Sequence, residues 1–250
     1  MENLFFSTDC ADLVCKEDTN GGCYMHSHKM IELIYYVDGT HTAVVNNHSR
    51  QMTADCISVT NPYEPHFYTS SDNGRLILMQ LNDLYLMQLR ALFPDIMFEN
   101  FLTDREVNRQ ILREIRLLIS EENAHPLLKS SIVNKILYLI AAHYSADRSG
   151  VKSVVQQALE YIYTNYEKNL TRDSLSKVFG YNPVYFAHIF KQSMGMSLTT
   201  YINVVRYNAV QNKLAENGGK NKTTTILNAG FSSTLNYYRF VKKLKDLGMH

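Results

Sequence analysis

The segment Asn169–Gly195 constrains the fold of this chain most strongly, because it reads as two short helices joined by a tight turn. Thr171 supplies a capping hydroxyl at the start of the first helix, and Gly180 ends that helix with a residue that tolerates left-handed backbone. Pro183 suits the first turn of the second helix, where a missing N–H costs no hydrogen bond. The segment therefore predicts a helix-turn-helix, whose second helix fits the major groove of DNA.

A related pattern recurs about fifty residues later. Gly230-Phe231 repeats the pair Gly180-Tyr181 and is followed by an aromatic and basic stretch of helical character. A long amphipathic segment begins after Ser197 and separates the two copies. We therefore expect two helix-turn-helix units joined by a rigid helix.

Residues 151–247 resemble the DNA-binding domain of AraC-type (AraC/XylS family) transcription regulators, the first unit more closely than the second. The residues that match the family pattern in the first unit are Leu170, Leu175, Phe179, Gly180, Tyr181, Tyr185, Phe186, Phe190, Lys191 and Gly195. This resemblance implies a regulator that binds double-stranded DNA in a sequence-specific manner. It also implies a homodimer, with RNA polymerase as a further partner.

The first unit offers few side chains suited to reading bases. Spacing predicts the buried set Leu175, Val178, Tyr185, Phe186, Ile189 and Phe190. The remaining positions, our candidates for DNA contact, are Asn182, Val184, Ala187, His188 and Lys191. By the family pattern, Val184, Ala187 and His188 stand where base contacts are made, where apolar groups meet thymine methyls and His188 meets a guanine edge. Because Arg is missing from this set, shape and phosphate contacts should matter more.

The second unit departs from the family pattern. Its candidate DNA contacts are Ser232, Thr234, Leu235, Arg239 and Lys242, with Lys243 also placed for phosphates. Arg239 is the strongest candidate for a base contact, and Ser232 can present a helix N-terminus to a phosphate. However, Ile226 replaces the small residue usual in the family and ends a β-branched run that favours helix poorly. We therefore expect the second unit to be less stable than the first or to dock differently.

The charge distribution agrees with a DNA-binding C-terminal half. Residues 151–250 contain 13 Lys and Arg against five Asp and Glu, a net charge of +8, whereas residues 1–150 carry −7. Neutralisation of phosphates supplies much of the affinity for nucleic acid. The basic half coincides with the helix-turn-helix pattern, and the acidic half is a poor surface for DNA.

Residues 22–80 alternate strand-like runs with turn signals. The predicted strands are Ile31–Val37, His41–Val45, Cys56–Thr60 and Arg75–Leu81. Asp38-Gly39, Asn46-Asn47 and Asn61-Pro62 provide turns between them. Short strands without intervening helices predict a small β-barrel or sandwich.

His26, His28 and Glu32 form a run H-x-H-x3-E-x6-G that resembles the first cupin motif. On a regular strand all three side chains share one face, and His66 can complete the set. The second cupin motif is only partly present, in the segment Asn61–His66. Three interpretations remain open: a hydrogen-bonded structural cluster, a divalent metal site with these four ligands, or direct contact with an organic effector that also involves Tyr36.

From Asn82 onward the apolar spacing changes to that of helices. We expect a short helix before Pro94, a second over residues 104–122 and a third over residues 127–147. In the family, such helices form the dimer interface, and alternatively they cover the barrel. The predicted domains are a cupin-like sensor at 1–82, a helical linker for dimerisation at 83–148 and a bipartite helix-turn-helix domain at 149–250.

The predicted fold class is therefore α+β with two domains: an N-terminal cupin-like β-barrel with a helical linker, and a C-terminal all-α domain with two helix-turn-helix units. No run approaches the roughly 18 to 20 apolar residues of a membrane span, so we expect a cytoplasmic protein without membrane contact. The four cysteines, Cys10, Cys15, Cys23 and Cys56, form no CxxC pair and are expected to be reduced.

The function predicted from these features is a non-enzymatic transcription regulator that responds to a small molecule or another signal and requires no cofactor. One alternative is a cupin metalloenzyme, such as a dioxygenase or isomerase, with a helical appendage. This enzyme would leave the charge asymmetry and the two helix-turn-helix units unexplained. A helical scaffold for protein partners is a third candidate, and it predicts no salt-dependent affinity for DNA.

Overall fold

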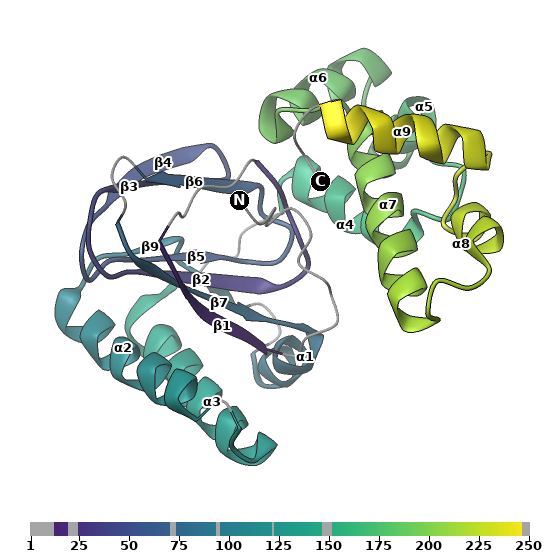
Figure 1. Cartoon of the computed structure of the whole chain (residues 1–250). Helices are drawn as coiled ribbons and strands as arrows, with labels where there is room; N and C mark the ends of the chain where they lie inside the picture. Colours follow the sequence, from purple (N-terminus) through teal and green to yellow (C-terminus); the bar gives the residue numbers. More distant parts are fainter. Residues whose placement is uncertain are drawn as a thin grey trace. The chain divides into compact units, whose positions relative to one another are not determined.

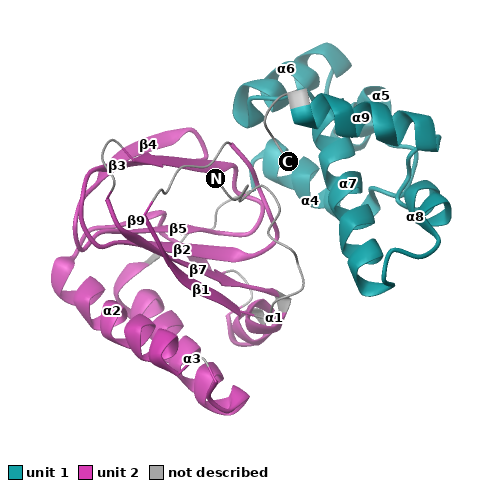
Figure 2. Cartoon of the chain, viewed as in Figure 1, with its two compact units in different colours: residues 1–10, 152–250 teal, residues 11–151 magenta. Residues whose placement is uncertain are grey.

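The computed structural model describes residues 13–19, 25–70, 74–93, 96–121, 123–146 and 152–246. The chain divides into two compact units, one of residues 11–151 and one of residues 152–250 together with 1–10 (Figure 2). Cys10, Cys23, Pro94 and residues 147–150 lie outside the described residues. Cys15 and Cys56 are free thiols.

The unit of residues 11–151 contains two antiparallel sheets. The larger sheet has the order β1-β7-β2-β5-β9, formed by Leu13–Asp18, Leu76–Leu81, Ile31–Tyr36, Ile57–Thr60 and Phe101–Leu102. The smaller sheet has the order β4-β3-β6, formed by His48–Met52, His41–Val45 and His66–Ser70. A short ladder pairs β8 (Met97–Phe98) with β10 (Ser145–Ala146).

The larger sheet is buried on both faces, which explains why all six residues of β2 and of β7 are buried. In Figure 1, α2 and α3 lie along one face and the smaller sheet lies over the other. Leu33 and Tyr35 belong to the core formed with the helices. Because side chains alternate along a strand, Glu32, Ile34 and Tyr36 face the smaller sheet. This interior between the sheets contains the polar groups discussed below.

Three helices follow β7 in this unit: α1 (Asp83–Leu92), α2 (Arg105–Ser120) and α3 (Pro126–Tyr144). The Asp104 side chain caps α2 by accepting from the backbone N–H groups of Glu106 and Val107. Buried aliphatic residues of α2 and α3 share one core with the sheet, including Ile111, Ile115, Ile132, Val133 and Ile136. Of the two roles expected for these helices, a dimer interface or a cover for the strands, the structure thus shows that α2 and α3 cover the larger sheet.

The unit of residues 152–250 is helical throughout its described part. Its helices are α4 (Val154–Asn165), α5 (Arg172–Phe179), α6 (Pro183–Met194), α7 (Leu198–Glu216), α8 (Lys222–Asn228) and α9 (Thr234–Asp246). α5 contacts α6, α8 contacts α9, and α7 contacts helices of both pairs. Two helix pairs joined by a long helix are the expected arrangement.

The predicted fold class is confirmed in outline, with a difference in the sheets. The four predicted strands correspond to β2, β3, β5 and β7, but the described strands form two larger sheets and the short β8–β10 ladder instead of one closed barrel. The strands β1, β4 and β6 and the two-residue strands β8, β9 and β10 were not predicted. β4 is exposed at four of its five residues, so it lacks the apolar alternation that marks a half-buried strand. No helix in the described part of the chain is long and apolar enough to cross a membrane.

Candidate functional sites

The first helix-turn-helix is formed by α5 and α6, and local signals determine both ends of its turn. Thr171 and Ser174 cap α5 reciprocally, each side chain accepting from the other residue's backbone N–H. Gly180 ends α5 with φ of 72°, a left-handed conformation that glycine adopts without strain. The Asn182 side chain caps α6 by accepting from the N–H groups of Val184 and Tyr185.

The buried face of α6 is narrower than predicted. Phe186 and Phe190 are fully buried, but Tyr185 is 55% exposed and stacks on Tyr181 with ring centroids 6.0 Å apart. Ile189 is half-buried. The prediction of a buried Tyr185 was wrong because the core stripe follows the four-residue spacing of Phe186 and Phe190, which turns Tyr185 about 100° away. Val178 of α5, also predicted to be buried, is 51% exposed.

The predicted DNA contacts of α6 lie mostly on its exposed side. Val184 is 69% exposed, and Asn182, His188 and Lys191 are also exposed, whereas Ala187 is half-buried. Because the Asn182 oxygen already caps the helix, only its amide N–H groups are available for DNA. An apolar Val184 next to a polar His188 is a surface suited to a mixed groove contact.

The second helix-turn-helix is formed by α8 and α9. α8 forms despite its β-branched run, but Asn221 at its start has left-handed backbone and gives no side-chain cap. Ile226, the residue that departs from the family pattern, is buried together with Phe231 and Tyr237. Ser233 caps α9 by accepting from the N–H of Asn236.

The five predicted DNA contacts of the second unit all lie near or on α9. Leu235, Arg239, Lys242 and Ser232 are exposed, and Thr234 is half-buried. Ser232 accepts a hydrogen bond from the Asn236 side chain at 2.7 Å. Lys243, on the same helix, is exposed.

In the unit of residues 11–151, the four residues of the predicted cluster are brought together. His26 and His66 exchange backbone hydrogen bonds in an isolated bridge, and Glu32 lies on β2. One donor atom from each of the four side chains lies within 4.8 Å of the others. His28 is in the loop before β2, so the strand geometry that predicted a shared face does not apply to it.

The hydrogen bonds of this cluster leave an imidazole nitrogen and a carboxylate oxygen facing each other without a hydrogen bond between them. His66 Nδ1 lies 2.8 Å from the carbonyl of Glu64, which only accepts, so Nδ1 carries the proton. His66 Nε2 then faces Glu32 Oε1 at 3.4 Å, and neither atom has a hydrogen-bond partner. Nδ1 of His28 is likewise buried without a partner.

The second oxygen of Glu32 is fixed by two neighbours. Gln80 Nε2 donates to Oε2 at 2.7 Å, and His28 Nε2 lies 3.1 Å from the same oxygen. Burial opposes ionisation of Glu32, but electrostatic attraction to His66 and His28 and the hydrogen bond with His28 hold the pKa of this carboxyl well below its ordinary range. Burial also opposes the charged form of His66, and Glu32 outweighs that effect and raises the pKa of the imidazole.

Two residues that support the cluster were missed in the sequence. Gln80 is the cross-strand partner of Glu32 in the β2–β7 ladder, a long-range pairing that leaves no local signal. Glu64 orients His66 through its carbonyl, and its carboxylate accepts from Asn46, Asn61 and Asn100. Burial raises the pKa of Glu64, although the hydrogen bonds from Asn61 and Asn100 oppose it. The partial motif at Asn61–His66 contained Glu64 but gave no reason to select it.

Tyr36, a predicted effector contact, is fully buried on the same face of β2 as Glu32. Its hydroxyl lies 2.9 Å from Ser58 Oγ, and its ring lies against His41 with centroids 4.8 Å apart. The interior between the sheets thus contains buried polar side chains among apolar ones such as Ile34, Leu78 and Val45.

Two protein-family models match the chain. The model described as AraC-like ligand binding domain matches residues 16–137, and the model described as helix-turn-helix domain matches residues 175–247. The histidine cluster lies within the first match. The second helix of each helix-turn-helix, α6 and α9, which we call the reading helices, lies within the second match.

The named relatives are transcriptional regulators. An uncharacterized HTH-type transcriptional regulator, YtdP of Bacillus subtilis, is 25% identical over 146 residues, 58% of this chain and 18% of the relative. The lactose operon transcription activator of Staphylococcus xylosus is 23% identical over 159 residues, 62% of this chain and 54% of the relative. The chain thus spans about half or less of the length of these relatives.

Solved structures of ToxT from Vibrio cholerae have a similar fold. An apo ToxT variant aligns with a TM-score of 0.55 and 11% identity over 93% of both chains. ToxT bound to an unsaturated fatty acid aligns with a TM-score of 0.52 and 11% identity, over 92% of this chain and 90% of that one. At this identity the likeness shows a common fold only.

Proposed function

Because this chain belongs to the AraC-type transcription regulators, which join an AraC-like ligand-binding domain to a helix-turn-helix domain, we propose that it binds specific sites on double-stranded DNA and regulates transcription in response to a signal. The named relatives are regulators, and the family assignment therefore excludes the alternative of a cupin enzyme.

The observation that carries this proposal is that the Lys and Arg side chains on the two reading helices are not paired with carboxylates in the described residues. In residues 152–246, the ion pairs use Lys152, Arg172 and Lys213, and none of these residues is on α6 or α9. Lys191 on α6 and Arg239 and Lys242 on α9 are therefore available to phosphates and bases, together with the remaining predicted contacts. Unpaired cations on the exposed faces of helix-turn-helix units are what duplex DNA requires.

A selection experiment tests DNA binding. Purified full-length protein is incubated with genomic fragments, bound fragments are sequenced, and the affinity of one recovered duplex is measured over a series of salt concentrations. We expect enrichment of a common site and an affinity that falls steeply with salt. Absence of enrichment together with salt-independent binding would contradict the proposed function.

We propose further that the signal acts on the interior of the N-terminal unit, and that the cluster of His26, His28, Glu32 and His66 holds a divalent metal ion. The imidazole centroids of His26, His28 and His66 are 4.1 to 5.5 Å apart, which leaves room for an ion rather than for an organic molecule between them. Nitrogen and carboxylate donors of this kind suit Zn, Fe, Mn or Ni.

The spacing of the donors can be compared with that around a bound ion. Ligand atoms bonded to one metal at about 2.1 Å lie about 3.4 Å apart in a tetrahedral site and about 4.2 Å apart when they are opposite each other. The four ligand atoms, within 4.8 Å of one another, therefore have to move closer together to hold an ion. A bound ion would supply the positive charge between Glu32 Oε1 and His66 Nε2, which face each other without a hydrogen bond. The Glu64 carbonyl holds His66 in the tautomer that a metal ligand needs.

Metal content is measured directly by elemental analysis of protein purified without a chelator. We expect close to one equivalent of a divalent transition metal per chain. Less than a tenth of an equivalent, with no uptake on addition of Zn²⁺ or Mn²⁺, would leave the cluster as a structural hydrogen-bond network and Tyr36 as a candidate contact for an organic effector instead.

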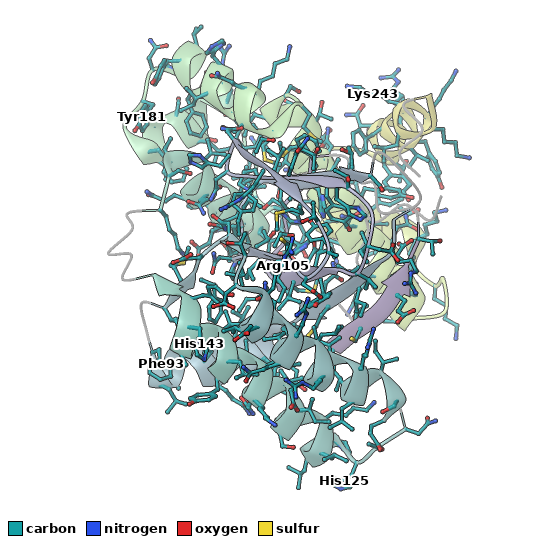
Figure 3. All side chains as sticks on the ribbon, turned by 90° about the vertical axis from the view of Figure 1, so that its left-hand side faces the viewer. Phe93, Arg105, His125, His143, Tyr181 and Lys243 are labelled. Atoms are coloured by element: carbon teal, nitrogen blue, oxygen red, sulfur yellow. The ribbon has the colours of Figure 1, made fainter. Side chains whose placement is uncertain are left out.

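For the assembly, we propose a homodimer formed by the helices at 83–148, with RNA polymerase as a further partner. α2 and α3 expose Leu117, Leu127, Leu128 and Tyr138, with Leu127 75% exposed. Figure 3 places His125 at the tip of the hairpin that these helices form. Light scattering of the parent and of Leu127→Lys tests this surface, because the parent should have the mass of a dimer and the variant that of a monomer. The same mass for the two proteins would contradict the proposed interface.

A further inference from the structure

A polar pocket lies between α7 and α9 within the C-terminal unit. Its volume is about 500 Å³, and its polar lining includes Ser197, Thr200, Asn203, Asn236, Arg239 and Lys243. Arg206 also reaches it, so three cationic side chains line the pocket, and no carboxylate is among the described residues that line it. The pocket is therefore positively charged.

One wall of the pocket is the N-terminus of α7, a helix of 19 residues. Ser197 caps this helix by accepting from the N–H of Thr200, and its hydroxyl lies 2.8 Å from the Thr200 hydroxyl. Backbone N–H groups in the first turn of a helix have no partner within the helix, and they favour anions. Both the helix end and the lining cations thus attract negative charge to the same place.

The three cationic side chains of the pocket differ in the hydrogen bonds that they already make within the protein. Arg206 Nε donates to the Tyr166 carbonyl at 2.8 Å and its Nη2 donates to the Lys168 carbonyl, so its guanidinium serves the protein itself. Lys243 Nζ makes only a long contact of 3.4 Å with Thr200 Oγ1. Arg239 is in none of the ion pairs of the described residues 152–246. Lys243 and Arg239 therefore remain available to a ligand.

The stripe of α9 that lines the pocket carries an arginine and a lysine where the matching stripe of α6 has neither. Counted from the first residue of each helix, Asn236, Arg239 and Lys243 of α9 correspond to Tyr185, His188 and Gln192 of α6. α9 begins four residues after Gly230, whereas α6 begins three residues after Gly180. The later start buries Tyr237 where the first unit buries Phe186, and leaves a polar stripe facing α7.

We propose that this pocket binds one phosphodiester group of the DNA backbone, held by Lys243, the Thr200 hydroxyl and the first-turn N–H groups of α7. The proposal rests on the proposed function and deepens it, because it assigns a phosphate-binding role to α7, the helix that joins the two units. DNA is the occupant that the geometry favours, since Lys243 and Arg239 lie on the reading helix of the second unit. A phosphate bound here fixes the register of that helix on the duplex.

The test uses the duplex recovered by genomic selection and a series of copies in which one phosphate at a time is replaced by an uncharged methylphosphonate. Full-length parent, Lys243→Gln, Thr200→Val and the control Lys242→Gln are compared by fluorescence anisotropy. We expect one position where the replacement weakens the parent but weakens Lys243→Gln and Thr200→Val far less. Lys243→Gln should also lower the slope of log affinity against log salt by about one, for all duplex sequences.

The outcomes separate this inference from the function on which it rests. If the parent shows no salt-dependent binding to any duplex, the proposed function fails. If the parent binds but Lys243→Gln keeps the parent's slope and its full methylphosphonate pattern, the pocket does not bind phosphate. If Lys243→Gln weakens only one sequence, Lys243 reads a base, and the inference is overturned. Lys242→Gln should retain the sensitivity at the assigned phosphate, and circular dichroism checks that each variant is folded.

Discussion

Gly230 lies against Arg206 so closely that a Cβ at position 230 would stand 2.8 Å from Arg206 Nε and 2.5 Å from the Tyr166 carbonyl oxygen. Arg206 donates to that same carbonyl and to the carbonyl of Lys168. The linker helix α7, the segment after α4 and the turn of the second helix-turn-helix therefore meet at one point. The position of the second helix-turn-helix relative to the first therefore depends on a glycine at position 230.

Replacing Gly230 by Ala should destabilise the protein more than the same change at Gly180. Both glycines have left-handed backbone, with φ of 89° and 72°. A Cβ at Gly180 would meet nothing within 4 Å, so Gly180→Ala should cost about 1 kcal/mol from backbone strain alone. Gly230→Ala adds a steric conflict with backbone and should cost about 3 kcal/mol. Urea denaturation of the two variants checks this, and equal losses would show that the contact at Gly230 relaxes freely.

The metal proposal predicts that Glu32→Gln removes stabilisation by added metal. A ligand at about 100 times its dissociation constant stabilises the folded state by about 2.7 kcal/mol. The parent, freed of metal by a chelator, should therefore show a higher melting temperature when Zn²⁺ is restored, whereas Glu32→Gln should not respond. Glu17→Gln, a change at an exposed carboxylate on β1, is the control and should respond as the parent does. A full response in Glu32→Gln would remove Glu32 from the ligand set.

The stability of the N-terminal unit should fall in acid partly through Asp55. Its Oδ1 accepts from the Tyr35 hydroxyl at 2.6 Å and its Oδ2 accepts from Arg109 at 2.8 Å. Partial burial raises the pKa of this carboxyl, but the hydrogen bonds from Tyr35 and Arg109 outweigh it and lower the pKa below its ordinary value of 3.8. Because the folded-state pKa is the lower one, this stabilisation is present above the ordinary value and is lost as the pH falls through the folded value.

Asp55→Asn should therefore be less stable than the parent at pH 7 and should lose less stability between pH 5 and acid conditions below the ordinary carboxyl pKa. Thermal melting of both proteins over this pH series measures the difference. Parallel pH profiles for the two proteins would mean that other carboxyl groups account for the acid sensitivity.

Arg239→Ala and Lys242→Ala should weaken DNA binding in different ways. If Arg239 contacts a base, its loss costs about 1 to 3 kcal/mol on the selected site and less on other sequences. Lys242→Ala should weaken binding to all sequences and flatten the salt dependence, as expected for a phosphate contact. Anisotropy titrations with the selected duplex and with a scrambled duplex separate the two. Parent-like binding of both variants to both duplexes would remove these residues from the interface.

The two reading helices differ in how well the sequence predicted them. In the first helix-turn-helix, the cap Thr171, the stop at Gly180 and the first-turn Pro183 were predicted at their observed positions, because each acts on backbone groups within a few residues. The exposure of Tyr185 was not predicted, since an aromatic residue beside the core stripe can either pack inward or stack on a neighbour such as Tyr181. In α9 the late start of the helix, and with it the polar stripe, was not visible from the Gly-aromatic pattern.

By itself the sequence determined the class of the protein: two helix-turn-helix units, a β-rich N-terminal half with a cluster of His26, His28, Glu32 and His66, and opposite charges on the two halves. These follow from short-range spacing and composition. Only the tertiary structure decided that His66 Nε2 faces Glu32 Oε1 with no hydrogen bond between them, and that Lys243 faces the start of α7. The physical reason is that both contacts join residues more than thirty positions apart, whose separation is set by strand pairing and helix packing rather than by any local pattern.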